Sequence, residues 1–426
     1  MNNSMDNIQK VKQSLKRRSR SETRFRWYGR AAIMLGLAAV VLLFTDIVSK
    51  GHGAFKATYI QLEIDYNIDA LGINSLSDKN QLMQANWDAL PKIGLRKVFS
   101  EVSGRRDKRQ LYNLVSNGAG FDLKDHLLEN PLLLGQTETR WVLADDDIDT
   151  YYKSWLDGEP YAARLSKKQV QWIGQLHQQA QIRLQLNTNL LTRGDSREPE
   201  QAGIRGAVVG SLLTLLLTLM LSFPIGVAAA IYLEEFAAKN RFTDFIEVNI
   251  NNLAAVPSII FGLLGLAVFI NFFHVPRSVP IVGGLVLTLM TLPTVIITSR
   301  AAIKSVPPSI REAALGMGAS RYQVVLHHVL PLALPGMLTG AIIGMAQALG
   351  ETAPLLMIGM VAFIVDIPQA FNDPATVLPV QIFLWADSPE RAFIEKTSAA
   401  IMVLLSFLLI MNVSAVWLRK RLERRW

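Results

Sequence analysis

Long apolar stretches recur along the chain, and those in its second half contain almost no charged side chains. An α-helix of about 20 apolar residues can cross the hydrocarbon core of a bilayer. A single strand could not, because its backbone polar groups would stay unpaired in lipid. The pattern predicts about six transmembrane helices, at residues 31–48, 207–233, 253–273, 279–298, 334–365 and 399–418.

Residues 51–203 separate the first predicted span from the others, and they are mostly polar. A segment this long is expected to fold as a domain rather than to form a loop. Residues 58–66 alternate like a strand with one buried face, which would hold Ile60, Leu62 and Ile64. Helices are expected at residues 88–102, 109–115 and 167–191. The prediction is a mixed α/β domain inserted into an otherwise all-α polytopic membrane protein.

The formal net charge of +8 comes mainly from basic clusters near the two ends of the chain, within residues 10–30 and 419–425. Basic clusters directly beside apolar spans are typical of the cytoplasmic side of a membrane. An RNA-binding tail is the competing interpretation, but the position beside the spans favours a membrane role. We therefore expect membrane lipid and no nucleic acid as a partner.

Six spans then place both termini in the cytoplasm and residues 51–203 outside it. A long basic segment precedes the first span, which favours an anchor over a cleaved signal peptide. The expected parts are a basic tail (1–30), the first transmembrane helix (31–48), an extracytoplasmic domain (51–203), a membrane core (204–418) with a cytoplasmic loop (306–331), and a second basic tail (419–426).

Candidate metal sites are few. The chain has no cysteine, which excludes disulfides and zinc–thiolate sites. Residues 145–149 form an acidic run that could bind calcium. The run lacks the glycine and the distal glutamate of an EF-hand loop, so a solvated acidic turn is the better interpretation. We predict no metal site.

The loop between the fourth and fifth predicted spans contains several residues that typically start or end helices. Pro307 and Pro308 should end the fourth span and start a short helix at Ser309. Gly316 and Gly318 should end that helix.

A second short helix is expected after this turn. Ser320 can cap it, and Pro331 should end it. Arg311 and Glu312 are expected to be exposed beside small alanines, where another protein could approach closely. The prediction is a compact helix–turn–helix on the inner surface.

Glu312-Ala313-Ala314, then Gly318, then Leu330-Pro331 resembles the EAA loop of bacterial ABC-importer permeases. His328 occupies a position that is usually apolar in that loop. The resemblance implies a coupling helix that docks on a cytoplasmic ATPase, formed here by Arg311, Glu312, Ala313, Ala314, Gly318, Leu330 and Pro331. An ordinary amphipathic interfacial helix is the alternative.

Further motifs resemble the PstA-type permeases of phosphate ABC importers. They lie at residues 231–235, 256–263, 334–340 and 350–356. The resemblance runs from about Gly206 to the C-terminus and implies a type I permease core; the first tail and residues 51–203 would make this a longer variant.

The resemblance also implies partners. They are a second permease (PstC-like), a cytoplasmic ATPase dimer (PstB-like) and a periplasmic phosphate-binding protein (PstS-like). The sequence has no G-x-x-x-x-G-K-[ST] phosphate loop. We therefore expect a non-catalytic chain that binds no cofactor, with ATP–Mg used by the partner ATPase.

Four residues are pathway candidates: Ser258, Gln347, Glu351 and Thr352. Glu351 is the one acid well inside a predicted span, and it either lines the pathway or packs against the other subunit. Related permeases often carry an arginine at the position of Gln347. Since no Lys or Arg lies deep in the spans after Gly206, the cation that an anion needs is expected from the partner permease.

Other functions remain open at this point. Another oxyanion, such as molybdate or sulfate, could be the solute. A stand-alone secondary transporter would predict inverted repeats and several intramembrane ionisable groups, and neither is seen. A membrane sensor would need a cytoplasmic signalling domain, for which the two tails are short.

Overall fold

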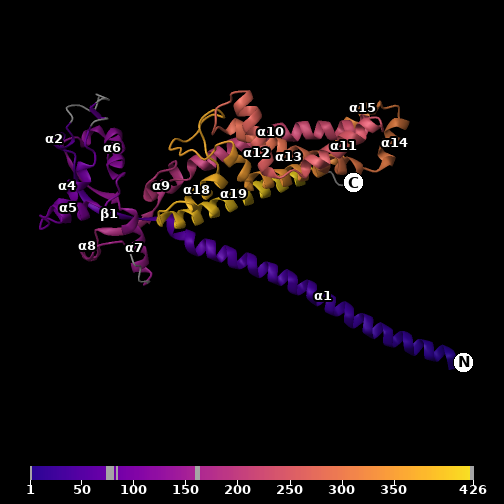
Figure 1. The fold of residues 1–426 in the computed structure, drawn as a ribbon, viewed down its shortest axis with the longest axis horizontal. Coiled ribbons are helices and arrows are strands. Elements are labelled where there is room, and N and C mark those ends of the chain that lie inside the picture. Colours follow the sequence, from indigo (N-terminus) through magenta and orange to yellow (C-terminus); the bar gives the residue numbers. More distant parts are fainter. Residues whose placement is uncertain (1, 73–80, 83–84, 159–163, 423–426) are drawn as a thin grey trace. The chain divides into compact units, whose positions relative to one another are not determined.

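The computed structural model describes residues 2–72, 81–82, 85–158 and 164–422, and it divides into two units, Met1–Lys50 and Gly51–Trp426. The first unit is the helix α1 (Asn2–Gly51), drawn in indigo in Figure 1. Its apolar part confirms the first predicted helix, because Arg18–Phe55 is long and apolar enough to cross a membrane.

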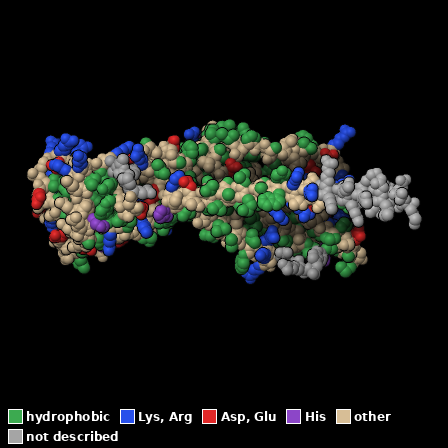
Figure 2. Space-filling view, turned by 90° about the horizontal axis from the view of Figure 1, so that it is seen from below, with side chains coloured by type: hydrophobic (Ala, Val, Ile, Leu, Met, Phe, Trp, Pro, Cys, Tyr) green, Lys and Arg blue, Asp and Glu red, His purple; other side chains and the backbone are tan. Residues whose placement is uncertain are grey.

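Four more helices in the described part of the chain could cross a membrane, and a bent pair would make a further span. The four are α10 (Arg205–Ile231, followed by the π-helix η4, Tyr232–Phe236), α13 (Pro280–Lys304), α16 (Leu330–Gly350) and α19 (Ala392–Leu422). The predicted polytopic fold with about six spans is confirmed. On the face seen in Figure 2, apolar side chains gather on the helical segments.

The predicted span 253–273 is wrong as a single straight helix. Its first residues belong to α11 (Arg241–Ala254), which meets the following helix at a bend of 100°. That helix is α12 (Ser258–Gly265), continued by the π-helix η5 (Leu266–Phe272). Pro257 lies at the bend. A proline disfavours helical backbone in the residue before it, which explains why α11 does not continue into α12.

The predicted span 334–365 ends too late. α16 stops at Gly350, and a short helix, α17 (Ala353–Met357), follows. No helix or strand lies between Met357 and α18 (Leu378–Ala386). The break follows from extended backbone at Glu351 (φ −79°, ψ 120°) and from Pro354, which has no N–H to continue the ladder.

Gly51–Gly203 contains the predicted mixed α/β fold, which is confirmed. Three antiparallel strands lie in the order β2-β1-β3, namely β1 (Lys56–Asp65), β2 (Thr137–Leu143) and β3 (Ile182–Leu186). The predicted alternation in β1 is correct, because Ile60, Leu62 and Ile64 are fully buried. They join a core with Leu90, Leu123, Trp172 and other apolar side chains of the surrounding helices.

The helices around this sheet only partly match the sequence prediction. They are α2 (Ile68–Leu71), α4 (Ala89–Val98), α5 (Arg105–Tyr112), α6 (Ala119–Glu129), α7 (Asp146–Leu156), α8 (Lys167–Gln178) and α9 (Thr188–Thr192), with 3-10 turns η1 (His52–Phe55), η2 (Pro131–Leu133) and η3 (Pro199–Gln201). A single helix over 167–191 is wrong. Ala180 takes a left-handed conformation (φ 56°), and the chain then pairs with β1 as β3.

Candidate functional site

α14 (Pro308–Gly316) follows α13 and forms the first arm of the loop. Pro307 and Pro308 stand at its start, where a missing N–H costs no helical hydrogen bond. The helix ends before Gly318, whose φ of +86° lies in the left-handed region that glycine adopts without strain. The predicted start and end of this helix are correct.

Ser320 caps the second arm as predicted. Its Oγ accepts the N–H of Gln323 at 3.3 Å, and Gln323 Oε1 accepts the N–H of Ser320 at 2.9 Å. The predicted end at Pro331 is wrong, because helical structure continues through α15 (Arg321–Gln323) and the π-helix η6 (Val324–Val329) into α16. The wide turn of η6, in which the Leu330 N–H bonds to Val325 O, accommodates the missing N–H of Pro331.

Arg311 is not exposed as predicted; its side chain is only 23% accessible. Its Nη2 lies 2.8 Å from Glu235 Oε1, and its Nη1 donates to the carbonyl of Val306 at 2.7 Å. Nη2 also donates to the carbonyl of Ile303 at 3.0 Å. Arg311 therefore ties α14 to the end of α13 and to η4, because an arginine beside a helix C-terminus satisfies its last carbonyls.

The other residues of the loop divide between surface and core. Glu312 and Ala313 are exposed, whereas Ala314, on the same helix, is buried in a hydrophobic core. Leu330 and Pro331 are half-buried at the start of α16. The surface that another protein could reach on α14 thus includes the acidic Glu312 and the small Ala313, and Leu315 adds an apolar side chain that is 47% exposed.

A second ion-pair cluster links the last turns of α13 to η4 and to the middle of α11. Arg300, near the end of α13, pairs with Glu247 of α11 and lies 3.4 Å from Glu234 of η4. Lys304 also approaches Glu234 at 3.5 Å. Sequence reasoning noted Glu234 and Glu235 only as parts of a motif and missed Glu247. Glu247 lies 53 residues from Arg300 in the sequence and in the middle of α11, so no local signal pointed to this pair.

The pathway candidates lie around two helix breaks. Gln347 is exposed near the end of α16, and Glu351 and Thr352 form the half-buried step into α17. Within the described residues, the Glu351 carboxylate has no hydrogen-bond or ion-pair partner. Ser258 begins α12, which packs against α17. The structure brings three candidates into one segment and the fourth onto the neighbouring helix.

Among the described residues, the cations of the later spans lie near the ends of these helices, as the sequence indicated. Arg205 begins α10, and Arg300 and Lys304 lie in the last turns of α13. Lys396 lies in the first turns of α19 and is buried, and Arg419 lies close to the other end of that helix.

The acidic run is not a solvated turn. Residues 146–149 form the first turn of α7, and Asp145 caps it by accepting the N–H of Asp147 at 3.2 Å. The carboxylates of Asp145, Asp146 and Asp147 are half-buried and lie within 4.8 Å of one another, a spacing that a cation could use. Capping accounts for the position of Asp145 without an ion.

The half-buried carboxyl of Asp145 and the buried carboxyl of Glu200 predict a pH-dependent stability of the α/β domain. Burial, with repulsion from Asp146 and Glu200, raises the pKa of Asp145 to about 8. Burial raises the pKa of Glu200 to about 7. Both pKa values are higher in the folded than in the unfolded chain. The stability that these two protonated groups contribute is therefore fully present at low pH and is lost as the pH rises through 7 and 8.

We therefore expect the domain to unfold at a temperature lower by roughly 5 °C or more at pH 8.5 than at pH 5.5. Fluorescence of the full chain in nanodiscs would report this through the buried Trp172. Asp145→Asn keeps the helix cap, and Glu200→Gln keeps the acceptor for Ser116 Oγ; both should flatten the pH dependence. An unchanged slope in both variants would contradict the assignment.

Comparisons with known proteins match two separate parts of the chain, one in its first half and one in its second half. Residues 12–160 match a domain of unknown function (DUF3333), and residues 222–426 match the family described as binding-protein-dependent transport system inner membrane component. The probable ABC transporter permease protein YqgI of Bacillus subtilis is 30% identical over 55% of this chain and 83% of its own length. The phosphate transport system permease protein PstA of Haemophilus influenzae is 29% identical over 54% of this chain and 79% of its own length.

Among solved structures, a chain of the methionine ABC transporter MetNI in an inward-facing conformation overlaps with a TM-score of 0.44. It is 17% identical and covers 52% of this chain and 96% of its own length. The sequence matches confirm the resemblance to ABC-importer permeases that was identified from the EAA loop. The chain is an inner-membrane protein that belongs to the ABC transporter permease family, the membrane components of binding-protein-dependent transport systems.

Proposed function

We propose that this permease subunit forms half of the translocation pathway for inorganic phosphate. The observation that carries the proposal is the similarity to phosphate transport permeases. The PstA proteins of Haemophilus influenzae and Mycobacterium tuberculosis match more than half of this chain, at 29% and 28% identity. Molybdate or sulfate is the competing cargo within the same mechanism.

The chemistry of Glu351 supports phosphate over sulfate. Phosphate that carries a proton can donate a hydrogen bond to a carboxylate, whereas sulfate at neutral pH has no proton to donate. The carboxylate is half-buried and has no partner in the described part of this chain, so it is free to accept such a bond. A carboxylate that packs against the second permease is the alternative role for Glu351.

The complete importer would contain four kinds of subunit. A PstC-like permease would form the other half of the pathway and supply the buried cation. A PstB-like ATPase dimer would hydrolyse ATP–Mg and dock on α14, with Glu312 and Ala313 at the contact. A PstS-like protein would deliver the anion on the periplasmic side, where residues 51–203 would lie, with both termini in the cytoplasm.

Reconstitution of these four proteins in liposomes tests the cargo. We expect uptake of radiolabelled phosphate that depends on ATP and on the binding protein. A tenfold excess of unlabelled phosphate should suppress uptake, and the same excess of sulfate or molybdate should not. Suppression by molybdate or sulfate, with direct uptake of that anion, would instead identify another oxyanion as the cargo.

Replacing Gln347 by alanine should lower uptake by roughly tenfold, because a hydrogen bond to an anion is worth about 1.5–3 kcal/mol. The complex should still assemble, because the Gln347 side chain is exposed in this chain. Phosphate uptake and co-purification of the ATPase measure the two effects. Gln369→Ala, at another exposed glutamine in the segment after α17, is the matched control. Wild-type uptake by the Gln347 variant would count against a role in the pathway.

A further inference from the structure

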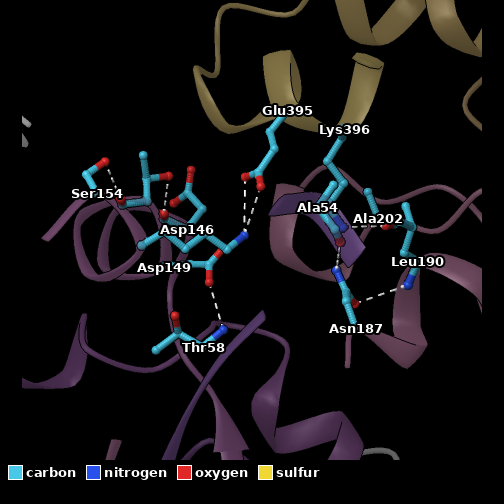
Figure 3. A network of polar contacts seen from close by, with 12 residues as sticks. Ala54, Thr58, Asp146, Asp149, Ser154, Asn187, Leu190, Ala202, Glu395 and Lys396 are labelled. Atoms are coloured by element: carbon cyan, nitrogen blue, oxygen red, sulfur yellow. Dashed lines mark hydrogen bonds and ion pairs between the residues drawn. The ribbon is translucent and has the colours of Figure 1, made fainter. Parts of the chain in front are cut away.

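A polar joint connects the α/β domain to the first turn of α19 (Figure 3). Lys153 of α7 lies 2.7 Å from Asp149 Oδ2, one helical turn earlier. The same Nζ lies 3.2 Å from both carboxylate oxygens of Glu395. Lys153 and Glu395 are 14% and 24% accessible, so this pair is shielded from solvent far more than an ordinary surface pair.

The joint reaches into the centre of the sheet. Asp149 Oδ1 accepts the N–H of Thr58 at 2.7 Å, and Thr58 belongs to β1, the central strand. Asn187, next to β3, donates to the carbonyl of Ala54 at 3.0 Å. A displacement of α19 at Glu395 would therefore pull on α7 and on the strand at the middle of the domain.

A second contact holds the same turn of α19. Lys396 is buried and donates to the carbonyl of Ala202 at 2.8 Å. On the neighbouring helix α18, Trp385 Nε1 donates to Asp195 Oδ1 at 2.8 Å. Two consecutive side chains of α19 thus contact two different segments of the α/β domain, which limits rotation as well as translation.

The charge on Lys153 is well protected. Burial lowers the pKa of Lys153, but attraction from Asp149 and Glu395 outweighs burial and raises the pKa above its ordinary value. Lys153 is therefore expected to stay charged at every physiological pH. Removing the lysine would leave two shielded carboxylates with no cation between them, which is strongly unfavourable.

α19 also packs against α16, the helix that ends at the proposed pathway. We propose that Lys153 is a positioning residue that makes the α/β domain move as one body with α19. The domain would then transmit engagement of the binding protein to the helices of the pathway. This step rests on the importer assembly proposed above, but the rigidity of the joint can be tested in this chain alone.

The absence of cysteine allows two spin labels to be placed without other changes. We would attach nitroxides at Leu128→Cys in α6 and at Asp387→Cys after α18, both exposed positions, and measure their distance in nanodiscs. The wild-type chain should give one narrow distribution, and Lys153→Met should broaden it. Lys153→Arg should restore the narrow distribution, because it keeps the charge.

In the full importer, Lys153→Met should lower the stimulation of ATP hydrolysis by the binding protein by at least about fivefold, the size of a typical coupling between sites. ATP hydrolysis without the binding protein should be unchanged. Lys168→Met is the matched control, because Lys168 pairs with Asp107 inside the domain and does not reach α19.

A narrow distance distribution in Lys153→Met would contradict the proposal that Lys153 holds the α/β domain to α19, whatever the cargo of the importer. Broadening with unchanged stimulation would overturn the transmission role. Failure of phosphate uptake in the wild-type importer would concern the cargo alone, because the distance measurement needs no substrate.

Discussion

Replacing Arg311 by alanine is expected to lower ATP-driven uptake by tenfold or more. The substitution removes the bonds to the carbonyls at the end of α13 and leaves Glu235, which is 13% accessible, without its cation. Loss of one partner of a hydrogen-bonded charge pair costs about 1–3 kcal/mol, and each 1.36 kcal/mol corresponds to a factor of ten. The energy is lost where α14 meets α13 and η4, so α14 would no longer move with them.

Three variants separate this effect from simple misfolding. Arg311→Lys keeps the charge but loses the planar fork of donors, so it should restore uptake only in part. The double variant Arg311→Ala with Glu235→Ala should recover part of the loss, because no buried charge is left unpaired. Arg241→Ala, at an exposed arginine that begins α11, is the control. Uptake and ATP hydrolysis in liposomes measure the outcome, and equal activity of Arg311→Ala and wild type would refute the coupling role.

Replacing Gly262 by alanine is expected to disrupt the contact between α12 and α17. A Cβ there would lie 2.7 Å from Pro354 Cα and 2.8 Å from Pro354 O. These are backbone atoms that cannot rotate away, so α17 would have to shift, together with Glu351 and Thr352 directly before it. Overpacking of this kind costs about 1–3 kcal/mol.

We expect a lower yield of folded protein, a lower unfolding temperature in detergent and a large loss of uptake. Gly344→Ala is the matched control within α16. The nearest atom to a Cβ there is Thr291 Cβ at 3.6 Å, an ordinary contact, and alanine favours a helix over glycine by about 1 kcal/mol. If the two variants behaved alike, the tight crossing at Gly262 would not be a determinant of the fold.

Hydrophobic patterning predicted the spans well but not their interruptions. Residues 334–365 are mostly apolar on both sides of Glu351, so hydropathy alone cannot reveal that the helix ends at Gly350. The end depends on the backbone at Glu351 and on Pro354. Pro257 shows the same limit, because transmembrane helices often contain proline and only packing decides whether it bends a helix by 100°.

Tertiary contacts explain most of the other differences. β3 lies in a glutamine-rich stretch that favours a helix locally, and pairing with β1 overrides that preference. Arg311 was expected to be exposed together with Glu312. Its partner Glu235 is 76 residues away in the sequence, so no local pattern could show the pair. The EAA loop was predictable, because its prolines, glycines and serine cap act within a few residues.

The place of β1 in the sheet has a consequence for biosynthesis. This strand leaves the ribosome first, yet it is the central strand, and its neighbours are separated from it by long stretches of later sequence. Until residues 182–186 have been synthesised, one edge of β1 stays without a partner and can associate with other chains. Final closure of the sheet therefore falls just before α10 enters the membrane, and a delay in translation near that point would prolong the exposure.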